Sequence, residues 1–82
     1  MPLAARPIGV FDSGIGGLSV LNALLAELPS ERFVYFADTA HAPYGERGDG
    51  YVIERARAVA RHLLDTRHIK ALVVACNTAT AA

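Results

Sequence analysis

Three short apolar runs, separated by stretches of helical periodicity, constrain the fold of this chain more than any other feature. The runs are IGVFD at 8–12, RFVYFAD at 32–38 and ALVVA at 71–75, and none of them alternates strictly between apolar and polar residues. Continuous apolar runs of this length are typical of strands buried on both faces of a parallel sheet. The sequence therefore predicts an α/β fold in which helices connect parallel strands.

Helical periodicity fills the gaps between the predicted strands. Leucines between Leu18 and Leu28 recur at helical spacing after a GIGG segment and predict a helix of about three turns. From Tyr51 to Arg67 a second helix is predicted, with its arginines on the solvated face. Its apolar stripe consists of Val52, Ile53, Ala56, Val59, Ala60, Leu63 and Leu64. The closing NTATAA segment has the small polar start of another helix, which gives the order β-α-β-α-β-α.

This order predicts a three-layer α/β/α unit, the first half of a flavodoxin-like sheet that is incomplete at its C-terminus. No linker or internal repeat divides residues 1–82, and the first seven residues are expected to form a loose lead-in. A strand order of 2-1-3 would open a crevice at the carboxyl ends of the first and third strands. The residues at those two ends are Asp12 with Ser13, and Cys76 with Asn77 and Thr78.

The long loop after the second predicted strand leaves the sheet from the same edge. It carries His41, Pro43, Tyr44 and Gly45, which we expect to close over the crevice. Loops of this length without secondary structure are often functional. The alternatives are an exposed loop histidine at His41 and a turn aromatic packed on the rim at Tyr44.

Composition excludes several classes of function. The 82 residues carry eight acidic and eight basic side chains without a basic cluster, so nucleic acid is not an expected partner. No apolar segment resembles a signal peptide or a membrane span, and a soluble, cytoplasmic protein is the default expectation. One cysteine and three scattered histidines predict neither an internal disulfide nor a metal site.

The single cysteine, Cys76, has two interpretations. At the start of a helix, unpaired N–H groups and the helix dipole would favour its thiolate and lower its pKa. Cysteine is also among the most buried residue types, and a core thiol after an apolar strand would be inert. Asp12 and Asp38 likewise have a plain alternative, as strand-end residues that make turn or cap hydrogen bonds.

The GIGGLS segment at 14–19 partly fits a dinucleotide-binding turn. It follows a strand and opens a helix, and Asp38 stands where a ribose-binding acid would lie. Ser19 replaces the third glycine of the G-x-G-x-x-G pattern, which weakens the match. A dinucleotide-binding module stays an alternative on spacing alone.

Three motifs at the predicted strand ends are more specific together than separately. FDSGIGGLSVL, DTAHAPYGER and ACNTATA occur in this order, and together they resemble the first half of bacterial glutamate racemases, in the aspartate/glutamate racemase superfamily. The resemblance runs from about Ile8 to Ala82. It favours glutamate racemase over the related aspartate racemases, which remain an alternative.

The resemblance implies interconversion of L- and D-glutamate, which supplies D-glutamate for peptidoglycan, without pyridoxal phosphate or metal. Two cysteines act on opposite faces of the substrate's α-carbon in this family, and Cys76 matches the first of them. Asp12 would assist proton transfer at Cys76 or hold the substrate ammonium group. The residues implied to bind the substrate are Asp12, Ser13, Tyr44, Gly45, Asn77 and Thr78.

The second cysteine and the second domain of the family have no counterpart in these residues. We therefore expect residues 1–82 to be the N-terminal part of the first racemase domain and to be inactive alone. The resemblance is compatible with a homodimer of the full-length enzyme, with glutamate as the small-molecule substrate.

Overall fold

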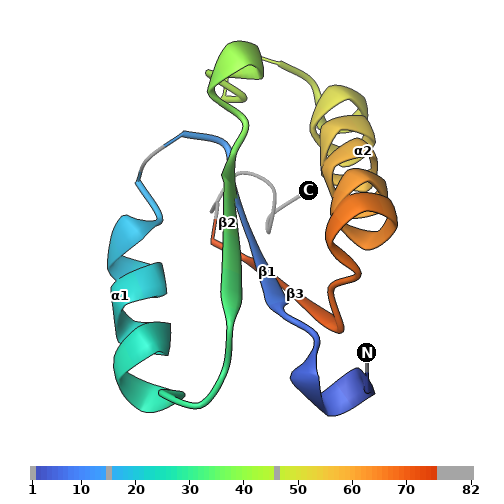
Figure 1. Cartoon of the computed structure of the whole chain (residues 1–82). Coiled ribbons are helices and arrows are strands. Elements are labelled where there is room, and N and C mark those ends of the chain that lie inside the picture. Colours follow the sequence, from blue (N-terminus) through green and yellow to red (C-terminus); the bar gives the residue numbers. More distant parts are fainter. Residues whose placement is uncertain (1, 15, 46, 76–82) are drawn as a thin grey trace.

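The computed structural model describes residues 2–14, 16–45 and 47–75, and these form a three-stranded sheet with helices on both sides (Figure 1). The strands are β1 (Ile8–Asp12), β2 (Phe33–Ala37) and β3 (Ala71–Val74). Both pairings are parallel, and the order is β2-β1-β3. This confirms the predicted α/β fold and the predicted strand order.

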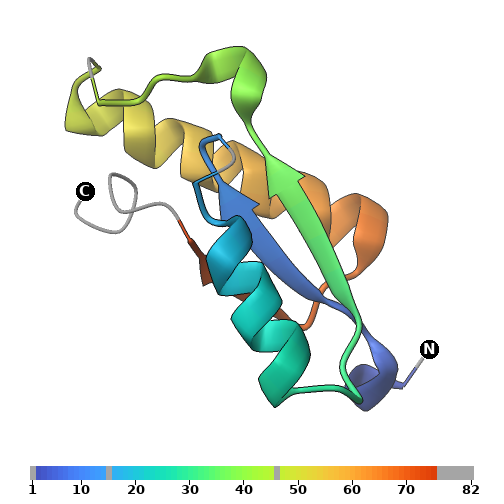
Figure 2. The same cartoon turned by 90° about the vertical axis from the view of Figure 1, so that its left-hand side faces the viewer.

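Helix α1 (Leu18–Glu27) and helix α2 (Asp49–Arg67) lie on opposite faces of the sheet, as the two views show (Figures 1 and 2). The chain moves from β1 outward to β2 and then back across β1 to β3. Because parallel crossovers share one handedness, moves in opposite directions place their helices on opposite faces. The three predicted layers are therefore present. The predicted last helix lies outside the described residues.

Two short 3-10 helices lie in segments expected to be irregular. Leu3–Ala5 forms one in the predicted lead-in, and Thr39–His41 forms the other at the start of the long loop. Helix α2 also begins two residues earlier than predicted, at Asp49 after the cap residue Gly48. An acid in the first turn interacts favourably with the positive end of the helix, which accounts for the earlier start.

The hydrophobic core lies between β1 and α2. It consists of Phe11, Tyr44, Val52, Val59, Leu63 and Ile69, each at most 5% exposed. The predicted stripe of α2 is correct at its centre but wrong at Ile53 and Leu64, which are 37% and 51% exposed. Both lie at the margin of the stripe, where the sheet does not reach them.

Burial differs between the three strands. β1 is buried from Gly9 to Asp12, as expected for a strand covered on both faces. β2 is half-buried throughout, and both end residues of β3 are exposed, so the prediction of two-sided burial fails for these strands. Each of them has a strand neighbour on one side only within the described residues. No helix in the described ranges is both long and apolar enough to cross a membrane.

Candidate functional site

The carboxyl ends of β1 and β3 converge as the topology predicted. Phe11 pairs with Val74, and the Ala75 N–H donates a hydrogen bond to the Phe11 carbonyl at 2.8 Å. A Cβ placed on Gly17 would lie 2.7 Å from the Ala75 Cβ and 2.8 Å from Asp12 Oδ2. Residue 75 therefore lies beside the Asp12 carboxylate. Cys76, Asn77 and Thr78 lie outside the described residues, and their roles stay predictions.

Asp12 is buried at the end of β1, with 3% of its surface exposed. Its Oδ2 accepts a hydrogen bond of 2.6 Å from the Gly17 N–H, and its Oδ1 accepts one of 3.3 Å from the Gly14 N–H. Gly17 is the cap residue of α1. The carboxylate thus satisfies a main-chain donor at the positive end of the helix. The structural alternative for Asp12, a cap and turn residue, is therefore present in the fold.

Tyr35, on β2, is a partner of Asp12 that the sequence analysis missed. Its hydroxyl lies 2.7 Å from Asp12 Oδ2 and 3.2 Å from the Gly14 carbonyl oxygen. Burial, the hydrogen bond to Asp12 and the charge of that carboxylate together raise the pKa of Tyr35 to about 12. One feature could have indicated this contact from the sequence. Tyr35 lies on the strand predicted to neighbour β1, two residues before Ala37, which pairs with Asp12.

Ser13 is half-buried directly after Asp12, and Gly45 is exposed in the loop after β2. Tyr44 was expected to bind substrate, with a rim aromatic as the alternative. Only 2% of its surface is exposed, so Tyr44 is a packed aromatic as in the alternative, but it lies in the core and not on the rim. Its ring lies 6.2 Å from Phe11 and 6.0 Å from Tyr51, centroid to centroid, and its hydroxyl donates a hydrogen bond to Asp38 Oδ2.

Asp38 follows β2 and is the centre of a second buried network. Arg55 donates from Nε to Oδ2 and from Nη2 to Oδ1, both at 2.8 Å, in a two-pronged ion pair. His41 Nδ1 lies 3.1 Å from Oδ1. Burial alone would raise the pKa of Asp38, but hydrogen bonds from Arg55 and Tyr44 and the Arg55 charge outweigh it and lower the pKa to about 2.

This network corrects two expectations. Arg55 was assigned to the solvated face of the second helix, yet its side chain is 22% exposed and holds Asp38. The pKa of Arg55 is raised, chiefly by its hydrogen bond to Asp38. Asp38 was the acid that a dinucleotide would need for its ribose. Because both of its oxygens already accept hydrogen bonds from buried or half-buried groups, Asp38 does not fit that role.

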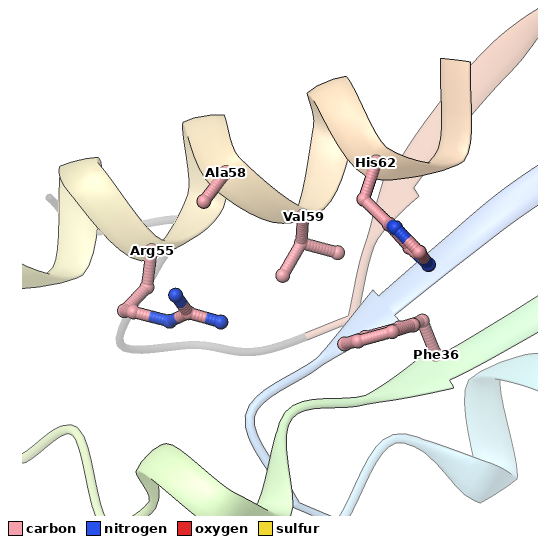
Figure 3. Close-up of a pocket in the computed structure, with 5 residues that line it drawn as sticks. All are labelled: Phe36, Arg55, Ala58, Val59 and His62. Atoms are coloured by element: carbon pink, nitrogen blue, oxygen red, sulfur yellow. The ribbon is translucent and has the colours of Figure 1, made fainter. Parts of the chain in front are cut away.

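A cavity of about 370 Å³ opens between β2 and α2 (Figure 3). It is lined by Phe36, Arg55, Ala58, Val59 and His62. The Phe36 and His62 rings meet edge to face, with centroids 5.6 Å apart. The cavity lies beneath α2, whereas the predicted crevice lies at the ends of β1 and β3, so its lining contains no predicted site residue.

In the part of the chain that the structure describes, no three His, Cys, Asp or Glu side chains gather closely enough to hold a metal ion. The buried acids Asp12 and Asp38 are instead engaged by tyrosine, arginine and main-chain donors. The arrangement holds two buried carboxylates near the carboxyl edge of a parallel sheet, where such folds bind their ligands.

Comparison with known proteins identifies close relatives by sequence, although no family model matches the chain. The chain is 58% identical over 78 residues to the glutamate racemase of Ralstonia pickettii, and 59% identical over 77 residues to that of Methylococcus capsulatus. These alignments cover 95% and 94% of the chain but 27% and 28% of the two relatives. The chain thus spans less than a third of their length.

Solved structures of glutamate racemases share the fold. The enzyme of Thermus thermophilus, in complex with β-chloro-D-alanine, matches 95% of the chain with a TM-score of 0.91 and 52% identity. The enzyme of Francisella tularensis, in complex with D-glutamate, matches 95% with a TM-score of 0.88 and 45% identity. The chain covers 30% and 29% of these structures.

Proposed function

We propose that this chain, which is homologous to glutamate racemases over 94% or more of its length, forms the first part of an enzyme that interconverts L- and D-glutamate. The D-glutamate that it forms would be used to build peptidoglycan. The observation that carries the proposal is this identity of 54% to 59% in alignments that cover 94% to 100% of the chain. A relative's solved complex with D-glutamate supports glutamate as the substrate.

Cys76 is the group proposed to exchange a proton with the substrate's α-carbon. The preceding residue, Ala75, lies beside the buried Asp12 carboxylate, which supports placing the thiol near that acid. A nearby carboxylate raises a thiol's pKa and makes its thiolate a stronger base. Asp12 is accordingly proposed to assist this proton transfer or to hold the substrate ammonium group.

The proposed reaction uses two thiols and no cofactor. The Cys76 thiolate removes the α-proton from one face, and the thiol of a second cysteine donates a proton to the other face. In the reverse direction the two groups exchange roles. The second cysteine is expected in the part of the relatives that this chain does not span. Hydrogen bonds to the α-carboxylate, in a site closed to water, would stabilise the developing carbanion.

Ser13, Gly45 and the main chain of Tyr44 are proposed to bind glutamate, together with Asn77 and Thr78. The hydroxyl of Tyr44 is engaged by Asp38, so this proposal assigns substrate contact at residue 44 to its main-chain atoms. A cytoplasmic location follows from the homology as a proposal, and the homodimer stays a prediction.

Two rival functions differ from this proposal in a measurable way. A dinucleotide-binding module loses support because Asp38 is occupied by Arg55 and Tyr44. An aspartate racemase would share the chemistry but prefer the shorter substrate. Comparing turnover of glutamate and aspartate separates the second rival, and titration with NAD separates the first.

The deciding experiment follows solvent deuterium into the α-carbon of D- and L-glutamate. The complete gene product should incorporate deuterium and racemise both isomers. Its Cys76→Ala variant should racemise neither isomer, because each direction needs both thiols, and it should lose deuterium exchange in the isomer whose α-proton faces Cys76. Cys76→Ser, which keeps a similar shape but is a much weaker acid, provides a matched control for packing. Unchanged racemisation by Cys76→Ala would exclude the catalytic assignment.

A further inference from the structure

We infer that the ion pair of Asp38 and Arg55 is a positioning device for the segment 39–48, which carries the proposed substrate contacts at Tyr44 and Gly45. The inference rests on the proposed function and extends it to Arg55, a helix residue outside the three strand-end motifs. In this arrangement Arg55 holds the Asp38 carboxylate, and Asp38 in turn holds the hydroxyl of Tyr44 in the loop.

The anchor itself is fixed on two elements of regular structure. Asp38 directly follows β2, and its N–H donates a hydrogen bond of 2.8 Å to the Asp12 carbonyl oxygen. Arg55 belongs to α2 and donates hydrogen bonds to both carboxylate oxygens of Asp38. A two-pronged pair fixes direction as well as distance, and a guanidinium does this where an ammonium would not. The pair therefore ties the end of the sheet to the second turn of α2.

Tyr44 transmits this anchor to the loop. Its hydroxyl donates to the same Asp38 oxygen that Arg55 Nε contacts, and its ring lies between Phe11 and Tyr51. The ring is thus fixed at both its apolar face and its polar tip. Tyr51 also places its hydroxyl 3.4 Å from the His41 carbonyl oxygen, so the loop meets α2 at a second point.

The consequence concerns the main chain around Tyr44. Only 2% of the surface of Tyr44, main chain included, is exposed, whereas Gly45 beside it is exposed. The Tyr44 carbonyl accepts a hydrogen bond from the Arg47 N–H at 2.9 Å, which shapes a turn around these two residues. Among the described residues, the N–H groups of Tyr44 and Gly45 donate to no main-chain carbonyl. The buried anchor at the Tyr44 side chain thus fixes the position of the exposed Gly45 beside it.

The test uses the complete gene product and three variants. Arg55→Ala removes the two-pronged grip, Tyr44→Phe removes only the hydroxyl, and Arg57→Ala removes an exposed arginine of the same helix as the matched control. For Arg55→Ala and Tyr44→Phe we expect the KM for glutamate to rise about tenfold while kcat changes less than about threefold, because binding contacts are lost in ground and transition states alike. Arg57→Ala should leave both constants unchanged.

Two further readouts distinguish positioning from general loss of structure. Guanidinium ion at sub-denaturing concentration should lower the KM of Arg55→Ala toward the original value, with sodium chloride of equal strength as control. Amide hydrogen exchange across 39–48 should be faster in Arg55→Ala and Tyr44→Phe, but not in Arg57→Ala. If Arg55→Ala does not fold, the Tyr44→Phe variant tests the inference by itself, because it keeps the aromatic ring in its packing site.

The outcomes separate this inference from the proposed function. A complete gene product that does not racemise glutamate overturns the proposed function, and hydrogen exchange then still tests the anchor. The inference is overturned if Arg55→Ala and Tyr44→Phe racemise glutamate with an unchanged KM. It is also overturned if hydrogen exchange in 39–48 is as slow in these variants as in Arg57→Ala.

Discussion

The hydroxyl of Tyr35 donates a hydrogen bond of 2.7 Å to the buried carboxylate of Asp12, across the junction of β1 and β2. The same oxygen of Asp12 accepts the Gly17 N–H at 2.6 Å, so one acidic atom joins both strands to the start of α1. Because hydrogen bonds to a charged acceptor are stronger than those between neutral groups, this junction restrains the proposed catalytic acid from two sides.

The Tyr35→Phe variant should be less stable than the original chain by about 2 kcal/mol, because it removes a hydrogen bond to a charged group. Tyr51→Phe is the matched control, since its hydroxyl contact is 3.4 Å long and exposed. That variant should change the free energy of unfolding by less than about 0.5 kcal/mol. Urea denaturation of both variants measures the difference, and equal stabilities would show that the Asp12 contact contributes nothing.

Gly17→Ala should destabilise the fold by about 2 kcal/mol through overpacking. The new methyl group would lie 2.7 Å from the Ala75 Cβ, which has no side-chain freedom, and 2.8 Å from Asp12 Oδ2, which is held by hydrogen bonds from the Gly17 N–H and the Tyr35 hydroxyl. Gly16→Ala is the control, because nothing lies within 4 Å of a Cβ at that position. Thermal unfolding compares the two. A melting temperature of Gly17→Ala no lower than that of Gly16→Ala would contradict the close approach.

Asp38 should make the fold sensitive to acid. Its pKa is lowered from an ordinary value of 3.8 to about 2 in the folded state, so its ionised form contributes stability above pH 4. That contribution, about 2 kcal/mol, is lost as the pH falls from about 4 through about 2. Carbon-13 NMR of the Asp38 carboxyl group measures the shift directly. A titration midpoint of Asp38 near pH 4 would show that Arg55 and Tyr44 do not stabilise its ionised form.

Tyr35 should have the opposite effect at alkaline pH. Its pKa is raised from 10.0 to about 12, so the folded state favours the protonated hydroxyl. The resulting stability is complete below pH 10 and is lost as the pH rises through about 12. Ultraviolet titration of tyrosinate should show a late-ionising group that is missing in Tyr35→Phe. Identical titration curves for the two proteins would exclude the assignment.

The fold was predictable from local patterns to a large extent. The apolar runs gave all three strands to within one residue at either end, and helical spacing gave both α1 and α2. The strand order was predictable because a β-α-β-α-β chain has few permitted topologies. Local periodicity did not reveal the 3-10 helix at Thr39–His41, since so short an element has no repeating pattern.

The candidate site was predictable only in part. Asp12 was expected at the carboxyl end of β1 and lies there, next to the residue that precedes Cys76. Tyr44 was expected in the site, but its burial was not. The roles of Cys76, Asn77 and Thr78 are still predictions from the family resemblance. Arg55 was missed because a helical wheel shows only whether a residue lies on the apolar stripe, and Arg55 borders it.

The sequence by itself determined the parallel α/β architecture and the edge of the sheet at which polar residues gather. Both depend on periodicity and chain order, which are local properties. Only the tertiary structure decided that Tyr35 holds Asp12 and that Arg55 holds Asp38, pairs that are 23 and 17 residues apart in the chain. Such contacts depend on strand register and on how α2 sits over the sheet. These are settled by packing of the whole core, with Phe11 and Tyr44 at its centre.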